Sequence, residues 1–163
     1  MRKQMGIVRL FSDGSSRGNP GPGGYGTILQ YEDNTGTIHE KTMSQGYLET
    51  TNNRMELLGC IVGFEALTRP CRVEVYSDSK YLVDAFNQKW IDSWVANGWR
   101  RGKSGPVKNT DLWKRLLAAM EKHEVSFNWI KGHADHPENE RCDKLATAAA
   151  DGKDLIEDEG FDE

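Results

Sequence analysis

The sequence predicts an α/β fold in which a five-stranded mixed sheet carries helices on both faces. Strand-like alternation with intervening turn residues fills the first third of the chain, helical periodicity begins near residue 53, and strands and helices then alternate. The chain has 163 residues, of which 37% are hydrophobic and 28% charged, enough for one core. We expect one domain over residues 1–150 and an acidic, disordered tail over 151–163.

The first three elements are predicted to be antiparallel strands at residues 5–12, 24–33 and 36–47. Asn34 and Gly36 lie where the second and third strands join and favour a hairpin turn. Because consecutive strands joined by short turns pair with one another, the sheet is expected to begin as an antiparallel ribbon.

The remaining elements are helices and strands in alternation, and the helical crossovers between strands predict parallel pairing. Pro70 ends the first helix, and Pro137 is a favoured first residue for the last one. In order, the elements are a helix at 53–69, a strand at 71–77, helices at 79–88 and 90–97, a helix that begins at Asn109 or Thr110, a strand at 125–130 and a helix from Pro137.

Composition excludes several classes of protein. The net charge of −4 is uneven, because residues 151–163 carry −6 and residues 1–150 carry +2. Three cysteines without CxxC spacing argue against a disulfide framework and a zinc site. The longest apolar stretch, 57–64, falls far short of the roughly 20 residues that span a bilayer, and no export signal is evident. We expect a cytoplasmic monomer that does not associate with membranes.

Two acidic residues follow predicted strands in the same short pattern. Asp13 and Asp78 each lie in Ser-Asp-(Gly/Ser)-Ser, directly after an apolar strand. Ligands of α/β sheets bind beyond the carboxyl ends of the strands, so a functional role is plausible for both. Each residue taken alone is better explained as an Asx-turn residue or a helix N-cap, but the repetition of the pattern weakens that explanation.

Two further carboxylates lie on predicted helices. Glu56 is in the first turn of a helix, where a capping box with Asn53 is the alternative explanation, and Asp143 could be an ordinary helix-flank residue. If the topology brings these two residues to Asp13 and Asp78, four like charges require cations between them. Oxygen ligands suit Mg²⁺ or Mn²⁺ rather than zinc. Two such ions can activate a water and stabilise a leaving oxygen in phosphodiester hydrolysis.

Six motifs follow one another in unbroken order from about residue 6 to 150: SDGS at 12–15, GNPGPGG at 18–24, TNNRMEL at 51–57, YSDS at 76–79, KGH at 131–133 and HPENERCD at 136–143. Together they resemble bacterial ribonuclease HI, the type 1 ribonuclease H family. The resemblance implies a ribonuclease H-like fold and a Mg²⁺-dependent endonuclease that hydrolyses the RNA strand of RNA/DNA hybrids, leaving 3′-hydroxyl and 5′-phosphate ends. It also implies a metal site formed by Asp13, Glu56, Asp78 and Asp143.

The resemblance assigns further roles. His133 matches a mobile histidine that assists proton transfer or product departure, work that suits an imidazole with a pKa near about 6.5. Lys80 stands where the family often has Gln, and we expect it to contact a phosphate. The residues expected to bind the minor groove and a DNA phosphate of the hybrid are Asn19, Thr51, Asn52 and Asn53.

A basic and aromatic segment, residues 89–115, has a net charge of +5 and holds four of the five tryptophans. Such a segment suits a nucleic-acid backbone, although tryptophans in a core and charges that merely solubilise would give the same composition. We interpret Trp113 as a core residue. By resemblance, the substrate-binding residues of this segment are Trp90, Trp94, Trp99, Arg100 and Arg101.

Two other functions compete with the nuclease. A noncatalytic hybrid-binding module would have lost one or more of the four carboxylates, and all four are present. A polynucleotidyl transferase core shares this fold but usually carries additional DNA-binding domains, for which 163 residues leave no room. Cleavage of a hybrid, compared with all-RNA and all-DNA duplexes, discriminates between these functions.

Overall fold

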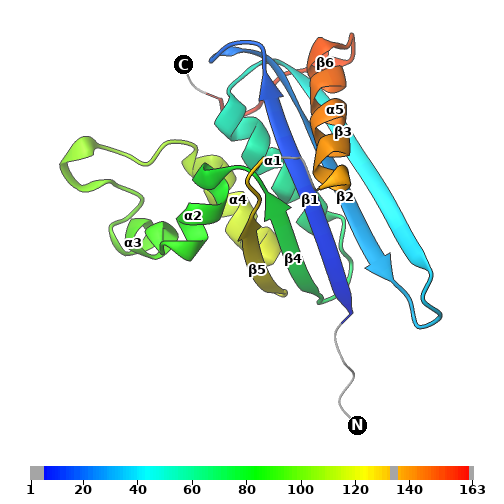
Figure 1. The fold of residues 1–163 in the computed structure, drawn as a ribbon. Helices are drawn as coiled ribbons and strands as arrows, with labels where there is room; N and C mark the ends of the chain where they lie inside the picture. The colour runs from blue at the N-terminus through cyan, green and yellow to red at the C-terminus, as the bar shows by residue number, and fades with distance from the viewer. Residues whose placement is uncertain (1–5, 133–135, 162–163) are drawn as a thin grey trace.

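A mixed sheet forms the centre of the protein, shown in Figure 1 as a computed structural model that describes residues 6–132 and 136–161. Within these residues the strand order is β5-β4-β1-β2-β3-β6. The strands β1, β2 and β3 are antiparallel, whereas β4 and β5 are parallel to β1, as predicted. The strands are β1 (Ile7–Ser16), β2 (Gly21–Glu32), β3 (Ile38–Thr50), β4 (Arg72–Ser77), β5 (Glu124–Trp129) and β6 (Leu155–Ile156).

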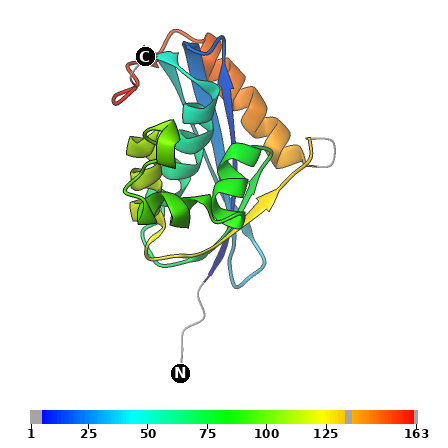
Figure 2. The ribbon, with the colours of Figure 1, turned by 90° about the vertical axis from the view of Figure 1, so that its left-hand side faces the viewer.

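Helices cover both faces of the sheet, which Figure 2 shows edge-on. One face carries α1, which is buried along most of its length because α4 packs against its outer side. The other face carries α5, which lies over β1, β2 and β3. The helices are α1 (Asn52–Glu65), α2 (Lys80–Asn87), α3 (Trp90–Ala96), the 3₁₀ helix η1 (Gly102–Ser104), α4 (Thr110–Met120) and α5 (Pro137–Asp151).

The core lies between the sheet and α1. The predicted helical stripe Leu57, Ile61 and Phe64 is fully buried and packs in one cluster with β1 and β4 residues such as Leu10 and Val75. Burial of each large apolar side chain contributes about 1.5–3 kcal/mol, so this cluster fixes α1 against the sheet. Among the described residues, no helix combines the length and apolar character needed to cross a membrane.

The C-terminal tail departs from the prediction. Leu155 and Ile156 form β6, which pairs with Gly46 and Tyr47 of β3, so the sheet has six strands rather than five. Asp158 is buried against an arginine of α1. The expectation of a disordered tail is therefore wrong for residues 152–161, because an apolar pair extends the sheet and a buried cation compensates one of the acidic charges.

Candidate active site

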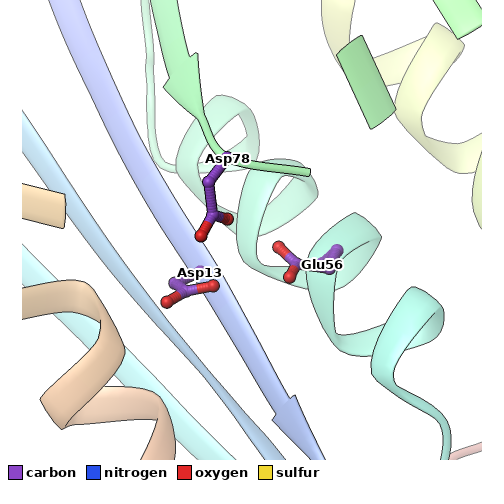
Figure 3. A group of neighbouring side chains, drawn as sticks. All are labelled: Asp13, Glu56 and Asp78. Atoms are coloured by element: carbon purple, nitrogen blue, oxygen red, sulfur yellow. The ribbon is translucent and has the colours of Figure 1, made fainter. Parts of the chain in front are cut away.

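Three acidic side chains from three different elements meet beside the sheet and point toward one another (Figure 3). Asp13 comes from β1, Glu56 from α1 and Asp78 from the residue directly after β4. Each contributes a carboxylate oxygen, and these oxygens all lie within 4.8 Å of one another. Asp13 and Glu56 are buried, whereas Asp78 is partly exposed. The cluster is thus anchored inside the fold and remains accessible on the side of Asp78.

Strand register places two of these residues side by side. In the parallel pair β1–β4, Phe11 is opposite Tyr76, so continuing two residues along each chain brings Asp13 level with Asp78. The sequence predicts that the first strand ends just before Asp13, but in the structure the strand continues past this residue. β1 continues to Ser16 because β2 still pairs with it, whereas β4 stops at Ser77.

The third carboxylate reaches the cluster because α1 lies unusually close to β1. A Cβ atom on Gly14 would lie 2.5 Å from the backbone nitrogen of Glu56, so only glycine permits this approach. The N-cap of α1 is Thr51, whose hydroxyl accepts a hydrogen bond from the Arg54 N–H at 3.3 Å. This excludes the capping box with Asn53 and leaves the Glu56 side chain to the cluster.

Replacing Gly14 by Ala is expected to reduce activity through geometry alone. The added methyl group must push α1 away from β1, and a displacement near 1 Å can cost about 100-fold in rate. Overpacking of this kind costs about 1–3 kcal/mol of stability, so the variant should still fold. The rate constant kcat and the melting temperature measure the two effects separately. As a control, the added methyl group of Gly6→Ala meets only the edge of the exposed Tyr31 ring, at 3.2 Å, and this variant should keep the wild-type rate.

The electrostatics of the cluster favour a cation. Burial raises the pKa of Glu56 well above its ordinary value, and the nearby charges of Asp13 and Asp78 raise it further. The Oε2 atom of Glu56 is buried and has no hydrogen-bond partner. Buried polar atoms are normally satisfied, so this orphaned oxygen, together with an all-oxygen donor set, fits a hard divalent cation.

Asp143 is not part of this three-residue group. Its side chain is exposed on α5, and the group within 4.8 Å consists of the other three acidic residues. The preceding residue, Cys142, is buried against Phe11 and Ile28; burial raises the pKa of its thiol, and the charge of Asp13 raises it further. α5 therefore carries Asp143 along the flank of the cluster, and its role as a fourth ligand stays a prediction. His133 lies outside the described residues.

The four residues predicted to contact the minor groove and a DNA phosphate of the hybrid do come together. They line one side of a groove of about 1130 Å³ at the start of α1, which Lys108 and Asn109 also line. The side-chain Oδ1 of Asn19 accepts a hydrogen bond of 2.8 Å from the backbone N–H of Asn52. This bond ties the β1–β2 loop to the helix start. The predicted residues in the groove are Asn19, Thr51, Asn52 and Asn53.

The tryptophans of the basic segment have mixed positions. Trp113 is fully buried, as predicted, and its ring centroid lies 5.5 Å from that of Trp94. Trp94 and Trp99 are half-buried and pack against the core, whereas Trp90 is 41% exposed. In Figure 1 the segment from α3 to η1 protrudes from the body of the molecule. Arg100 and Arg101 are exposed there, so the tryptophans support the protrusion and the arginines remain free for solvent or substrate.

Lys80 lies close to the carboxylates. Its Nζ is 4.6 Å from the centroid of the Trp129 ring, and the indole N–H of Trp129 donates a hydrogen bond of 3.2 Å to the backbone carbonyl of Asp78. The exposed ammonium is therefore held by a cation–π contact next to the cluster rather than moving freely.

Comparison with known proteins identifies the family. The RNase H family model matches residues 5–151. The chain belongs to the ribonuclease H family. It is 62% identical over 152 residues to the ribonuclease H of Lachnoclostridium phytofermentans, covering 93% of this chain and 96% of that protein. The ribonuclease H of Desulforamulus reducens is 54% identical over 143 residues, covering 88% of this chain and 87% of the relative.

Solved structures agree with this family. The crystal structure of LC9-RNase H1, described as a type 1 RNase H with the type 2 active-site motif, has a TM-score of 0.83 and 35% identity and covers 93% of this chain and 75% of that one. The N-terminal RNase H domain of rv2228c from Mycobacterium tuberculosis, solved as a fusion with maltose binding protein, has a TM-score of 0.67 and 28% identity, with 90% and 94% coverage. The ribonuclease H fold expected from the motifs is therefore confirmed.

Sequence reasoning missed a buried ion pair beside the groove. Arg54 and Asp158 each have a side-chain exposure of 3%. A signal for Arg54 was available, because it shares a helical face with Leu58 and Ile61 at spacings of four and seven residues. A charged residue in such an apolar stripe predicts a buried partner of opposite charge.

Proposed function

We propose that this ribonuclease H is an endonuclease that hydrolyses the RNA strand of RNA/DNA hybrids and leaves 3′-hydroxyl and 5′-phosphate ends. The observation that carries the proposal is the carboxylate cluster of Asp13, Glu56 and Asp78, formed by three elements of the family fold. Among the described residues, these three side chains form the acidic group that could hold a metal ion, and the groove lined by residues 51–54 begins on the same helix as Glu56.

The proposed cofactor is Mg²⁺, with Mn²⁺ as the alternative. When bound, the divalent ions supply an activated water and stabilise the charge on the leaving oxygen. Asp13 and Glu56 hold fixed positions because the sheet and α1 bury them, and Asp78 faces the substrate side. Asp143 on α5 is proposed to complete the ligand set, and His133 is proposed to assist proton transfer or the departure of product.

The groove and the protrusion are proposed to bind the hybrid in different ways. Amides and hydroxyls at the start of α1 suit 2′-hydroxyls and base edges in the minor groove, whereas Arg100 and Arg101 suit phosphates. Lys80, held beside Asp78, is proposed to contact a phosphate near the reacting bond. We further propose a monomer that acts in the cytoplasm, where its three cysteines remain free thiols, as they are here.

A comparison of substrates tests the proposed function. The purified protein is incubated with end-labelled RNA/DNA hybrid, all-RNA duplex and all-DNA duplex, each with Mg²⁺ and with EDTA. We expect cutting of the RNA strand of the hybrid with Mg²⁺ only, and 5′-phosphate ends that a phosphate-specific exonuclease degrades. Equal cutting of all three duplexes would contradict hybrid specificity. Binding without cutting would indicate a noncatalytic module, and strand joining would indicate a transferase.

A further inference from the structure

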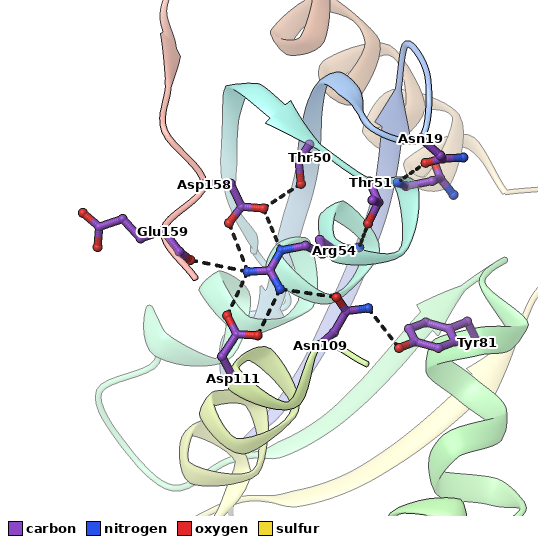
Figure 4. A network of polar contacts seen from close by, with 10 residues as sticks. Asn19, Thr50, Thr51, Arg54, Tyr81, Asn109, Asp111, Asp158 and Glu159 are labelled. Atoms are coloured by element: carbon purple, nitrogen blue, oxygen red, sulfur yellow. Dashed lines mark hydrogen bonds and ion pairs between the residues drawn. The ribbon is translucent and has the colours of Figure 1, made fainter. Parts of the chain in front are cut away.

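The C-terminal segment, residues 158–161, forms part of the wall of the groove. Gly160 and Phe161 line the same groove as Thr51, Asn52 and Asn53, although more than 100 residues separate them in sequence. Figure 4 shows this segment passing close to the start of α1. The tail is therefore next to the proposed hybrid contacts rather than remote from them.

One carboxylate of this segment holds both ends of the hybrid-contact stretch. Asp158 Oδ2 accepts hydrogen bonds of 2.7 Å from the hydroxyl of Thr50 and 2.7 Å from Nε of Arg54. Thr50 and Arg54 are the residues directly before and after the stretch 51–53. A single buried side chain thus bridges the end of β3 and the first turn of α1, and fixes the backbone between them (Figure 4).

Through Arg54 the same carboxylate reaches the opposite side of the groove. The guanidinium donates to both carboxylate oxygens of Asp111, at 3.0 and 2.8 Å, and Nη1 donates to Oδ1 of Asn109 at 3.3 Å. Asn109, which lines the groove, donates in turn to the hydroxyl of Tyr81 at 3.1 Å. The groove walls formed by α1 and by the start of α4 are therefore joined through one arginine.

The segment is shaped to fit this network. Gly160 has a φ of +88°, and a Cβ atom there would collide with the carboxylate of Asp111. The Phe161 ring lies 5.9 Å from the Arg54 guanidinium, in cation–π range. Steric fit, hydrogen bonding and ring contact all place the segment in one position.

We propose that Asp158 is a positioning residue for hybrid binding, and that the C-terminal segment completes the binding groove. Asp158 touches no reacting atom. Asp158 orders the stretch 51–53 before the substrate arrives, so hybrid binding does not carry the entropic cost of ordering this stretch. The proposal rests on the proposed function of this groove.

The test compares two variants that each remove one negative charge from the tail. Asp158→Asn weakens the bridge, whereas Glu157→Gln changes an exposed neighbour that makes no contact with Arg54 or Thr50 in the network described above. Hybrid affinity is measured by fluorescence anisotropy in EDTA, and KM and kcat are measured with Mg²⁺. For Asp158→Asn we expect Kd and KM to rise about 3- to 10-fold, which corresponds to the loss of one well-placed hydrogen bond. We expect kcat to stay within about twofold of the wild-type value. Glu157→Gln should match the wild type.

The proposal on Asp158 can be overturned by either variant. Unchanged Kd and KM in Asp158→Asn, or equal shifts in both variants, would overturn the proposal, as would a loss confined to kcat. If circular dichroism shows that Asp158→Asn does not fold, Phe161→Ala replaces it, because that ring lines the groove without taking part in the ion pair. An unchanged Kd in Phe161→Ala would then overturn the proposal. Failure of the wild type to cut the hybrid with Mg²⁺ refutes the proposed function instead, while the binding shift in EDTA still tests Asp158.

Discussion

Asp13→Asn is expected to lower the rate of RNA cleavage by about 10³-fold or more, while the protein stays folded. Asparagine has nearly the same shape as aspartate, and its Oδ1 can still accept the 2.9 Å hydrogen bond from the Gly14 N–H. It removes one anionic oxygen from a cluster whose oxygens lie within 4.8 Å of one another. Metal-ion stabilisation of a transition state is worth several kcal/mol, which corresponds to a rate loss of this order.

Two measurements separate lost chemistry from lost folding. The cleavage rate gives the first, and thermal melting with and without Mg²⁺ gives the second. We expect the metal-free variant to melt no lower than the wild type, since a charge that faces Glu56 has been removed. Mg²⁺ should raise the melting temperature of the wild type only. The control, Asp154→Asn, changes an exposed tail carboxylate and should behave as the wild type. A wild-type rate in Asp13→Asn would disprove the metal site.

The sequence predicted that Asp13 and Asp78 lie at one edge of the sheet because each residue directly follows an apolar strand in the same short pattern. Two neighbouring parallel strands that each run into an acidic residue bring those residues level, and the observed register does so. Glu56 was harder to predict from the residues alone, because a first-turn glutamate is equally explained by capping. Its role depends on the contact between Gly14 and α1, which links positions more than 40 residues apart. Only the family motifs pointed to it.

The tail was predicted wrongly for a physical reason. Composition counts charges but does not show their partners, and the partner of Asp158 is Arg54, 104 residues earlier in the chain. The apolar residues Leu155, Ile156 and Phe161 are spaced among the acids, so no continuous hydrophobic pattern marks them as ordered. A short edge strand and one buried ion pair order a segment that its average composition describes as solvated.

Arg54→Met is expected to reduce the free energy of unfolding by about 3–5 kcal/mol, because it leaves Asp158 buried without its cation. Burial lowers the pKa of Arg54, but hydrogen bonds to Asp111 and Asp158 raise it more, so the guanidinium stays charged in the folded protein. For a chain of this length, that loss lowers the melting temperature by roughly 10 °C. Urea unfolding measures the free energy directly.

Arg115→Met is the matched control, since Arg115 makes a two-bond ion pair with Glu65 in which the side chains are 47% and 38% exposed. Exposed ion pairs contribute about 0–1 kcal/mol, so the free energy of unfolding of this variant should be close to that of the wild type. Equal losses of unfolding free energy in Arg54→Met and Arg115→Met would show that the uncompensated buried charge does not cause the destabilisation of Arg54→Met.

A double variant, Arg54→Met with Asp158→Leu, separates the uncompensated charge from the packing around it. Replacing both partners of a buried ion pair by apolar residues is often neutral for stability, so most of the loss seen in Arg54→Met should be recovered. Hybrid affinity should not recover, because neither new side chain can form a hydrogen bond with Thr50, Asn109 or Asp111. Recovery of both would mean that the network stabilises the fold and contributes nothing to the order of the groove.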